Sequence, residues 1–235
     1  MTKTAAPSRH PGTVYGPRRA GTWTPAAIAL VVGAGLGLGV ATQVLRGMLP
    51  DALSRLADSG AVWLTVAFIV GSSVPRGIRN TAAAGAGTLA AALVAYSMTA
   101  LVGGAAPAGA GAWVGGSTLA GAGAWVATAL IGGPLFGIAG GWLRDEASWL
   151  VGGVPWRRIG ALAMLGGALA AAGLRGVFIE PTGNPGSVDL VAWLMLLGGP
   201  LVPLVIGRTA TERLYGTAAL PLVLVAGLGA FAAIH

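Results

Sequence analysis

The sequence predicts an all-α membrane protein, a bundle of about seven transmembrane helices. Two observations lead to this fold class. Seven separate apolar stretches lie along the chain, with charged residues almost confined to the gaps between them. Of the 235 residues, 55% are hydrophobic and only 9% are charged, and a water-soluble domain could not cover itself with so little charge.

The spans are placed where a window approaches the roughly 17 to 25 apolar residues that cross a bilayer core. The N-terminal tail, residues 1–22, holds three prolines and almost no aliphatic residues, so we expect a disordered cytoplasmic tail. Residues 23–235 are expected to form a single transmembrane helical domain. Its spans lie at about 25–45, 60–74, 81–102, 118–143, 159–178, 188–207 and 214–234. The second span is short and can borrow neighbouring residues.

The distribution of lysine and arginine orients this array, because short cytoplasmic loops carry an excess of positive charge. With a cytoplasmic N-terminus, all 14 basic residues except Arg46, Arg55 and Arg175 fall inside. An odd number of spans then places the C-terminus outside. The net charge of +7 is therefore interpreted as an orientation signal, with no nucleic acid as partner. A signal-peptide function for Arg18 and Arg19 is disfavoured, because the next stretch is long enough to span and six more follow.

Two connecting segments carry patterns of their own. In residues 46–60, leucines recur at helical spacing, which predicts a short helix lying on the outer surface, with a plain loop as the alternative. Residues 144–158 combine charges with tryptophans, a mixture expected at the level of lipid head groups. Both segments are therefore expected to lie at a membrane interface.

Glycines at four-residue spacing predict close contacts between helices. The pairs are Gly33 with Gly37 and Gly35 with Gly39, and the run is Gly133, Gly137 and Gly141. Such spacing puts small residues on one helix face and lets two backbones approach. Packing within the monomer is the favoured interpretation. Homodimerisation and a ligand-lining role remain as alternatives.

A weak internal repeat relates the second, fourth and sixth spans. Each has a tryptophan early and a glycine and proline late, and the string Gly-Gly-Pro-Leu occurs at both 132–135 and 198–201. The preceding spans are rich in glycine and alanine, which suggests three helical hairpins plus a final helix. Pro134 and Pro200 would then either kink their helices or break them at a transporter-like site.

Site chemistry is scarce in this sequence. Cysteine is absent, the histidines are His10 and His235 at opposite ends, and the middle of every predicted span lacks Asp, Glu, Lys and Arg. We therefore expect no enzyme activity, metal site or cofactor. The ligand or pairing candidates are Gln43, Trp63, Tyr96, Arg175 and Asp189. Arg175 can reach water at the outer end of its span, pair with Asp189, or belong to an outward substrate site.

Residues 56–72 read LADSGAVWLTVAFIVGS, after a Leu49-Pro50 turn and a glycine-rich first span, and Tyr96 follows in the third span. Over roughly the first hundred residues, the chain resembles a group of small actinobacterial integral membrane proteins of unknown function. This resemblance implies a location in the bacterial plasma membrane. It supplies no catalytic or binding residue.

Three hypotheses for function follow. The leading hypothesis is a non-enzymatic packing or assembly partner in the lipid bilayer, acting as a homo-oligomer or with another membrane protein, because glycine-rich helix faces are its main feature. The alternative is a small-molecule permease or the substrate-binding subunit of a transporter, with a cavity lined by Gln43, Trp63, Tyr96 or Arg175. A membrane enzyme acting on lipid is the third.

Overall fold

The computed structural model describes residues 21–49, 59–102, 126, 128–144, 150–151, 154–179 and 189–234. This part of the chain contains seven α-helices, two π-helical segments and two short antiparallel strands of two residues each. The α-helices are α1 (Pro25–Met48), α3 (Gly60–Ser73), α4 (Ile78–Val102), α7 (Gly133–Leu143), α8 (Trp156–Leu174), α9 (Leu190–Ile206) and α10 (Ala210–Ile234). The other elements are η1 (Thr128–Gly132), β1 (Leu150–Val151), β2 (Val154–Pro155) and η2 (Arg175–Ile179). The tail up to residue 20 and most of the predicted surface helix at 46–60 lie outside the described residues.

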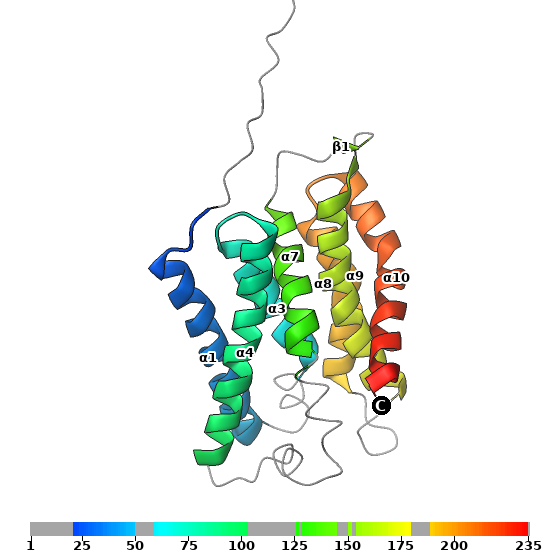
Figure 1. The fold of residues 1–235 in the computed structure, drawn as a ribbon. Coiled ribbons are helices and arrows are strands. Elements are labelled where there is room, and N and C mark those ends of the chain that lie inside the picture. The colour runs from blue at the N-terminus through cyan, green and yellow to red at the C-terminus, as the bar shows by residue number, and fades with distance from the viewer. Residues whose placement is uncertain are drawn as a thin grey trace, which may run out of the picture.

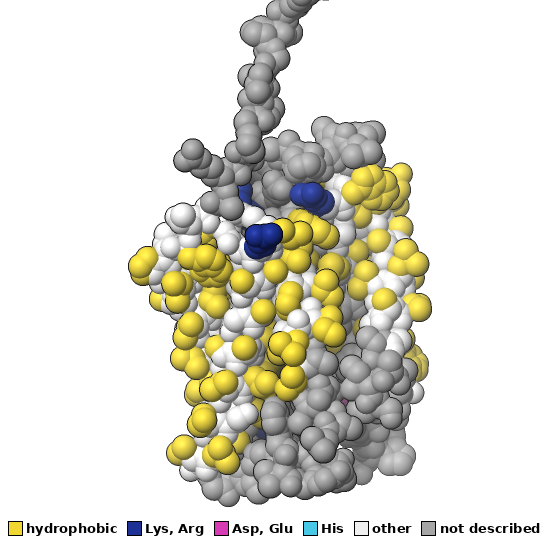
Figure 2. All heavy atoms as spheres, viewed as in Figure 1, with side chains coloured by type: hydrophobic (Ala, Val, Ile, Leu, Met, Phe, Trp, Pro, Cys, Tyr) yellow, Lys and Arg dark blue, Asp and Glu magenta, His cyan; other side chains and the backbone are white. Residues whose placement is uncertain are grey.

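The helices run alternately up and down the bundle (Figure 1). We call one end of the bundle the basic end. There α1, α4, α8 and α10 begin, and α3, α7 and α9 finish. Its basic residues in the described part are Arg76, Arg79, Arg144, Arg157, Arg158, Arg208 and Arg213. Figure 2 shows arginine side chains gathered at this end, above a surface that is largely hydrophobic.

Short polar caps fix where three of the helices begin. Thr24 accepts a hydrogen bond from the Ala27 amide at 3.2 Å, and Pro25 occupies the first turn of α1, where its missing N–H costs nothing. Ser59 caps α3 and Asp189 caps α9 in the same way. Each observed helix overlaps one of the predicted spans, because caps and apolar runs are both local features of the sequence.

The prediction of seven spans needs correction on length. Three helices are long and apolar enough to cross a membrane by length and composition: α1, α4, and α8 with η2 up to Phe178. Helix α3 has only 14 residues, which gives about 21 Å at 1.5 Å per residue. A bilayer core is about 30 Å thick. The helices Ala129–Leu143 and α9 are also short, and α10 is not among the three.

Glycines bring α3, α4 and α7 into backbone contact. A Cβ at Gly85 of α4 would overlap the carbonyl oxygen of Gly133, and a Cβ at Gly71 of α3 would overlap the backbone of Gly137. Gly141, one turn beyond Gly137 on α7, lies against the side chain of Thr81 on α4. Helix α7 is therefore wedged between α3 and α4 at distances that only glycine permits.

Of the two glycine pairs predicted on α1, only Gly35 and Gly39 pack against another helix. Gly35 and Gly39 are buried, and side chains there would collide with the backbone of α4 near Thr88 and Tyr96. In contrast, Gly33 and Gly37 have no atom within 4 Å of the position that a Cβ would occupy. The prediction that Gly33 and Gly37 pack within the chain is therefore wrong. A shift of two residues turns the helix by about 200°, to its far side.

The repeated Gly-Gly-Pro-Leu strings occupy similar positions in two helix pairs. Gly133 of α7 lies against Gly85 of α4, and Gly199 of α9 lies against Gly166 of α8. In both pairs the second glycine of the string contacts a glycine of the preceding long helix. The first predicted hairpin differs, because α1 packs chiefly against α4 and much less against α3.

The two prolines of these strings have different effects. Pro134 lies in the first turn of α7, directly after the π-helical segment η1. A π-helical turn is a common cause of a local bend. Pro200 lies inside α9, which continues as an α-helix to Ile206. The helix is therefore not broken at Pro200.

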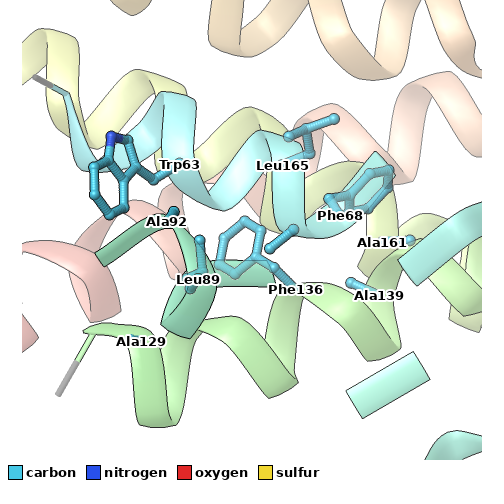
Figure 3. Close-up of a cluster of buried hydrophobic side chains, with 10 residues drawn as sticks. Trp63, Phe68, Leu89, Ala92, Ala129, Phe136, Ala139, Ala161 and Leu165 are labelled. Atoms are coloured by element: carbon cyan, nitrogen blue, oxygen red, sulfur yellow. The ribbon is translucent and has the colours of Figure 1, made fainter. Parts of the chain in front are cut away.

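The buried core is made mostly of small residues around a few large ones (Figure 3). Phe68 of α3, Leu89 of α4, Phe136 of α7 and Leu165 of α8 meet in one cluster. Alanines from the same helices fill the remaining space. Larger apolar side chains on every α-helix point outward, which leaves an apolar exterior.

Adjacent glycines on α9 offer a test of the backbone contacts. Gly199→Ala should destabilise the protein, because the new Cβ would stand 2.6 Å from the Ala170 side chain and from the Gly166 carbonyl oxygen. Gly198→Ala should be neutral or stabilising by up to about 1 kcal/mol, because Gly198 faces open space and alanine favours helix. Thermal unfolding of the purified variants in detergent measures both. Equal shifts for the two variants would contradict the described packing of α8 on α9.

Candidate functional site

Two of the predicted ligand candidates, Trp63 and Tyr96, meet at the end of the bundle opposite the basic end, and a third, Gln43, lies at the same end of α1. Gln43, one turn beyond Gly39, shares a face of α1 with Arg46, and Gly39 lies against the backbone of Tyr96. Arg46 Nη1 donates a hydrogen bond to Tyr96 Oη at 2.7 Å. The ring of Trp63 packs edge-on against Tyr96, with centroids 5.9 Å apart. We call these four residues the Tyr96 cluster.

The Tyr96 cluster combines buried polar atoms with aromatic rings. Trp63 is only 3% exposed, and the Oε1 atom of Gln43 is buried without a hydrogen-bond donor among the described residues. An unmet acceptor in a buried place costs free energy unless a water or ligand satisfies it. The cluster can therefore hold a small hydrogen-bond donor at Gln43. The rings of Trp63 and Tyr96 pack edge-on at the place where the permease alternative expects a cavity.

The other two candidates, Arg175 and Asp189, also lie at the end opposite the basic end. Arg175 opens η2, and Asp189 caps α9 by accepting a hydrogen bond from the Ala192 amide at 3.1 Å. The two segments touch where Gly176 lies against Ala192. The predicted ion pair between Arg175 and Asp189 stays a prediction.

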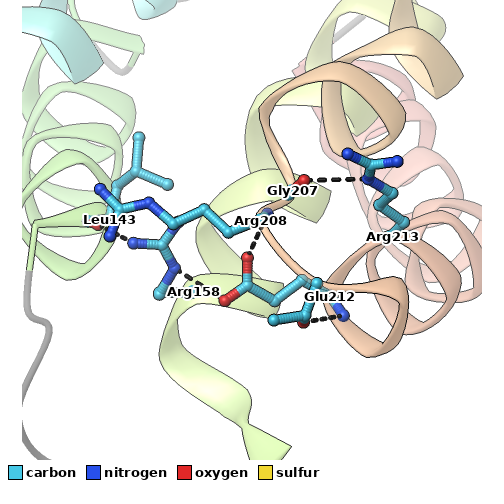
Figure 4. A network of polar contacts seen from close by, with 7 residues as sticks. Leu143, Arg158, Gly207, Arg208, Glu212 and Arg213 are labelled. Atoms are coloured by element: carbon cyan, nitrogen blue, oxygen red, sulfur yellow. Dashed lines mark hydrogen bonds and ion pairs between the residues drawn. The ribbon is translucent and has the colours of Figure 1, made fainter.

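A buried ion pair at the basic end was missed by the sequence analysis. Arg158, at the start of α8, donates from Nε to Oε1 of Glu212 on α10 at 3.0 Å (Figure 4). The side chains are only 7% and 5% exposed. Arg158 Nη1 also donates to the carbonyl oxygen of Leu143 at 2.8 Å, at the end of α7. One guanidinium thus joins α7, α8 and α10.

The loop between α9 and α10 completes this network. The second carboxylate oxygen of Glu212 accepts a hydrogen bond from the Arg208 amide at 2.8 Å, and the Glu212 amide donates to Thr209 Oγ1 at 3.1 Å. Arg213 Nε donates to the Gly207 carbonyl oxygen at 2.9 Å. Both carboxylate oxygens of Glu212 are therefore satisfied, as a buried charge requires.

The sequence placed Arg158 and Glu212 on the cytoplasmic side and did not pair them. They lie 54 residues apart in the chain, so no local spacing links them. The only available signal was that each stands at the start of a predicted helix on the same side. Pairing them requires knowledge that α8 and α10 are neighbours.

A pocket of 280 Å³ also opens at the basic end, between α3, α4 and α7. Arg76, Arg144 and Arg157 contribute to its lining. Arg144 Nη1 donates to the carbonyl oxygen of Ser72, in the last turn of α3. Among the described residues, three or more metal-ligating side chains do not come together anywhere.

The buried ion pair can be tested by a double-mutant cycle. Arg158→Met and Glu212→Met should each destabilise the protein by about 3 to 5 kcal/mol, because each leaves the partner charge buried and unpaired. The double variant should lose less than the sum of the two single losses. Thermal unfolding in detergent measures all three, with Arg79→Met, at an exposed position of the same end, as control. Additive losses would mean that the two groups do not interact.

Comparison with known proteins yields a family and nothing more specific. No curated protein and no solved structure matches the chain. Residues 17–235 match a family described only as being of unknown function, DUF6518. This match covers every described helix. The chain therefore belongs to the DUF6518 family of unknown function.

Proposed function

We propose that this protein is a multi-pass integral membrane protein of the bacterial plasma membrane, acting without enzymatic activity as a packing or assembly partner. The observation that carries the proposal is the apolar exterior of the bundle, where large side chains such as Val102, Val205 and Leu222 are highly exposed. Exposed apolar surface on this scale is costly in water and favourable in lipid. The three helices that are long and apolar enough to cross a membrane support the same conclusion.

The short helices do not argue against this location. A helix of 14 residues, such as α3, reaches only part of the way across a bilayer core, and its neighbours α4 and α7 cover much of its surface. Backbone that is enclosed by other helices needs no lipid contact along its full length. The longer α1 and α4 then set the thickness of the bundle.

The basic end supports an orientation of the bundle in the membrane. Seven arginines from three connecting regions lie at that end, in line with the excess of positive charge in cytoplasmic loops. The opposite end contributes Arg46 and Arg175 among the described residues. We place the basic end and the N-terminus in the cytoplasm, and the end of α10 outside.

The absence of cysteine makes this topology directly measurable. Single cysteines at Arg79 and Met48, both exposed and at opposite ends of the bundle, are introduced by Arg79→Cys and Met48→Cys. In intact cells, a membrane-impermeant maleimide should label Met48→Cys only, while both variants react after the membrane is opened. The reverse pattern would overturn the orientation. Labelling of both variants in intact cells would argue against a spanning bundle.

The assembly role is supported by the exposed side of α1. Only 22% of its most apolar window is buried, less than in the other two candidate spans. Gly33 and Gly37 lie on this exposed side with open space around them. Small residues at four-residue spacing on a lipid-exposed helix favour close contact with another helix, including a second copy of the same one.

The permease alternative is less well supported. It requires a cavity near Gln43, Trp63 or Tyr96, and in the described residues the two aromatic rings pack against each other there. The glycine contacts also hold the helices at backbone distance along much of the bundle. We therefore favour assembly over transport.

Self-association through α1 can be measured in membranes. Gly33→Leu combined with Gly37→Leu should abolish co-purification of two differently tagged copies from co-expressing cells, because two large side chains would hold the helices apart. Gly198→Leu is the matched control, since Gly198 is also in open space but lies on α9. If the tagged copies never co-purify, or if both variants behave alike, α1 does not mediate association between copies.

A further inference from the structure

The pocket at the basic end has a composition that the proposed assembly role does not explain. It is bounded by the end of α3, the start of α4 and the end of α7. Three arginines line it, and no acidic residue in the described part of the chain does. Its volume of 280 Å³ equals about nine water molecules at roughly 30 Å³ each. It is therefore large enough for a phosphate group with a small substituent.

The three arginines that line the pocket come from separate elements. Arg76 lies between α3 and α4, Arg144 follows α7, and Arg157 lies in the first turn of α8. Arg144 is held in place by its hydrogen bond to the Ser72 carbonyl oxygen and keeps further N–H donors for other partners. Guanidinium forks match the geometry of phosphate oxygens better than any other side chain.

The backbone at the start of α4 adds to this positive character. Gly77 adopts a φ of 134°, a conformation that strongly favours glycine, and the helix begins at the next residue. The first amides of a helix have no partner within it, and the helix dipole is positive at this end. Gly77 and Ile78 both line the pocket. These amides and the three guanidiniums favour the same kind of ligand, an anion.

Beside the arginines, the lining combines apolar side chains with the hydroxyl residues Ser72 and Thr81. Val74, Ile78, Ile138 and Trp142 border the pocket beside the arginines. A tryptophan next to basic side chains is typical of the level at which lipid head groups meet the hydrocarbon. Glu212, the acid of the buried ion pair, is held by Arg158 and does not line the pocket. The nearest acids in sequence, Asp145 and Glu146, lie outside the described residues.

We propose that this pocket binds the phosphate group of an anionic ligand through Arg76, Arg144 and Arg157. The phosphate can belong to the head group of an anionic phospholipid or to a small phosphate in the cytoplasm. Both sources offer the same oxygens to the same three arginines. The site goes beyond the assembly role, and binding to the detergent-purified protein does not depend on how the bundle is oriented.

Two probes distinguish the sources. Binding of inorganic phosphate is measured by calorimetry, and binding of a short-chain phosphatidylglycerol by native mass spectrometry, both with detergent-purified full-length protein. Arg76→Gln should weaken binding of whichever probe is recognised by about tenfold, because one charged hydrogen bond is lost. Arg157→Gln should also weaken it. Arg144 is left unchanged, because its loss would also remove the contact to Ser72.

Arg79→Gln is the matched control, because Arg79 lies in the first turn of α4 at the same end and does not line the pocket. It removes the same charge and should change affinity by less than about twofold, since exposed charges outside the site are screened by salt. Unchanged elution and thermal unfolding of each variant verify the fold.

Saturable binding of the lipid alone would assign the site to a phospholipid head group, and binding of inorganic phosphate would assign it to a soluble phosphate. Either result, with the expected loss in Arg76→Gln, supports the proposal. If neither probe binds saturably, or if Arg79→Gln weakens binding as much as Arg76→Gln, the pocket is not a phosphate site.

Discussion

Contact between helix backbones at glycine is the constraint on which the rest of this structure depends. Gly71 and Gly137 join α3 to α7, Gly85 and Gly133 join α4 to α7, and Gly166 and Gly199 join α8 to α9. In an apolar surrounding, helices gain nothing from simply hiding apolar side chains from each other, so close packing has to supply the attraction. With glycine inside, the large apolar side chains are displaced to the outer surface. This placement of glycines inside and large apolar residues outside therefore produces both a tight interior and an exterior suited to lipid.

The buried ion pair of Arg158 and Glu212 complements this packing at the basic end (Figure 4). Glycine contacts alone specify how neighbouring helices touch and leave the arrangement of their ends less defined. The guanidinium of Arg158 reaches α7 through the Leu143 carbonyl and α10 through Glu212. Because a buried charge without its partner is strongly unfavourable, the three helix ends are held in one arrangement. The chain thus uses van der Waals contact along the bundle and charge at its end.

The up-and-down order of helices connects these features to function. Since successive helices alternate in direction, connections that are far apart in the sequence come together at one end (Figure 1). Arginines from separate connections are thereby concentrated, and three of them line one pocket. In the orientation that we propose, the same arginines mark the cytoplasmic end and line the pocket that we propose for an anion. At the opposite end, the same alternation of helix directions brings residues of α1, α3 and α4 together in the Tyr96 cluster.

That each α-helix of the described residues overlaps an apolar run follows from the sequence by itself, because apolar runs, caps and breaks between them act over a few residues. So does the clustering of basic residues in alternate connections. The sequence could not distinguish Gly33 and Gly37 from Gly35 and Gly39, since both pairs have the same spacing and only the position of α4 decides which face is covered. It predicted Tyr96, Trp63 and Gln43 as candidates but neither their meeting nor the role of Arg46. Tertiary structure decided the pairing of Arg158 with Glu212 and the pocket lined by three arginines. Both features join residues from different helices, and packing, not order in the chain, sets which helices are neighbours.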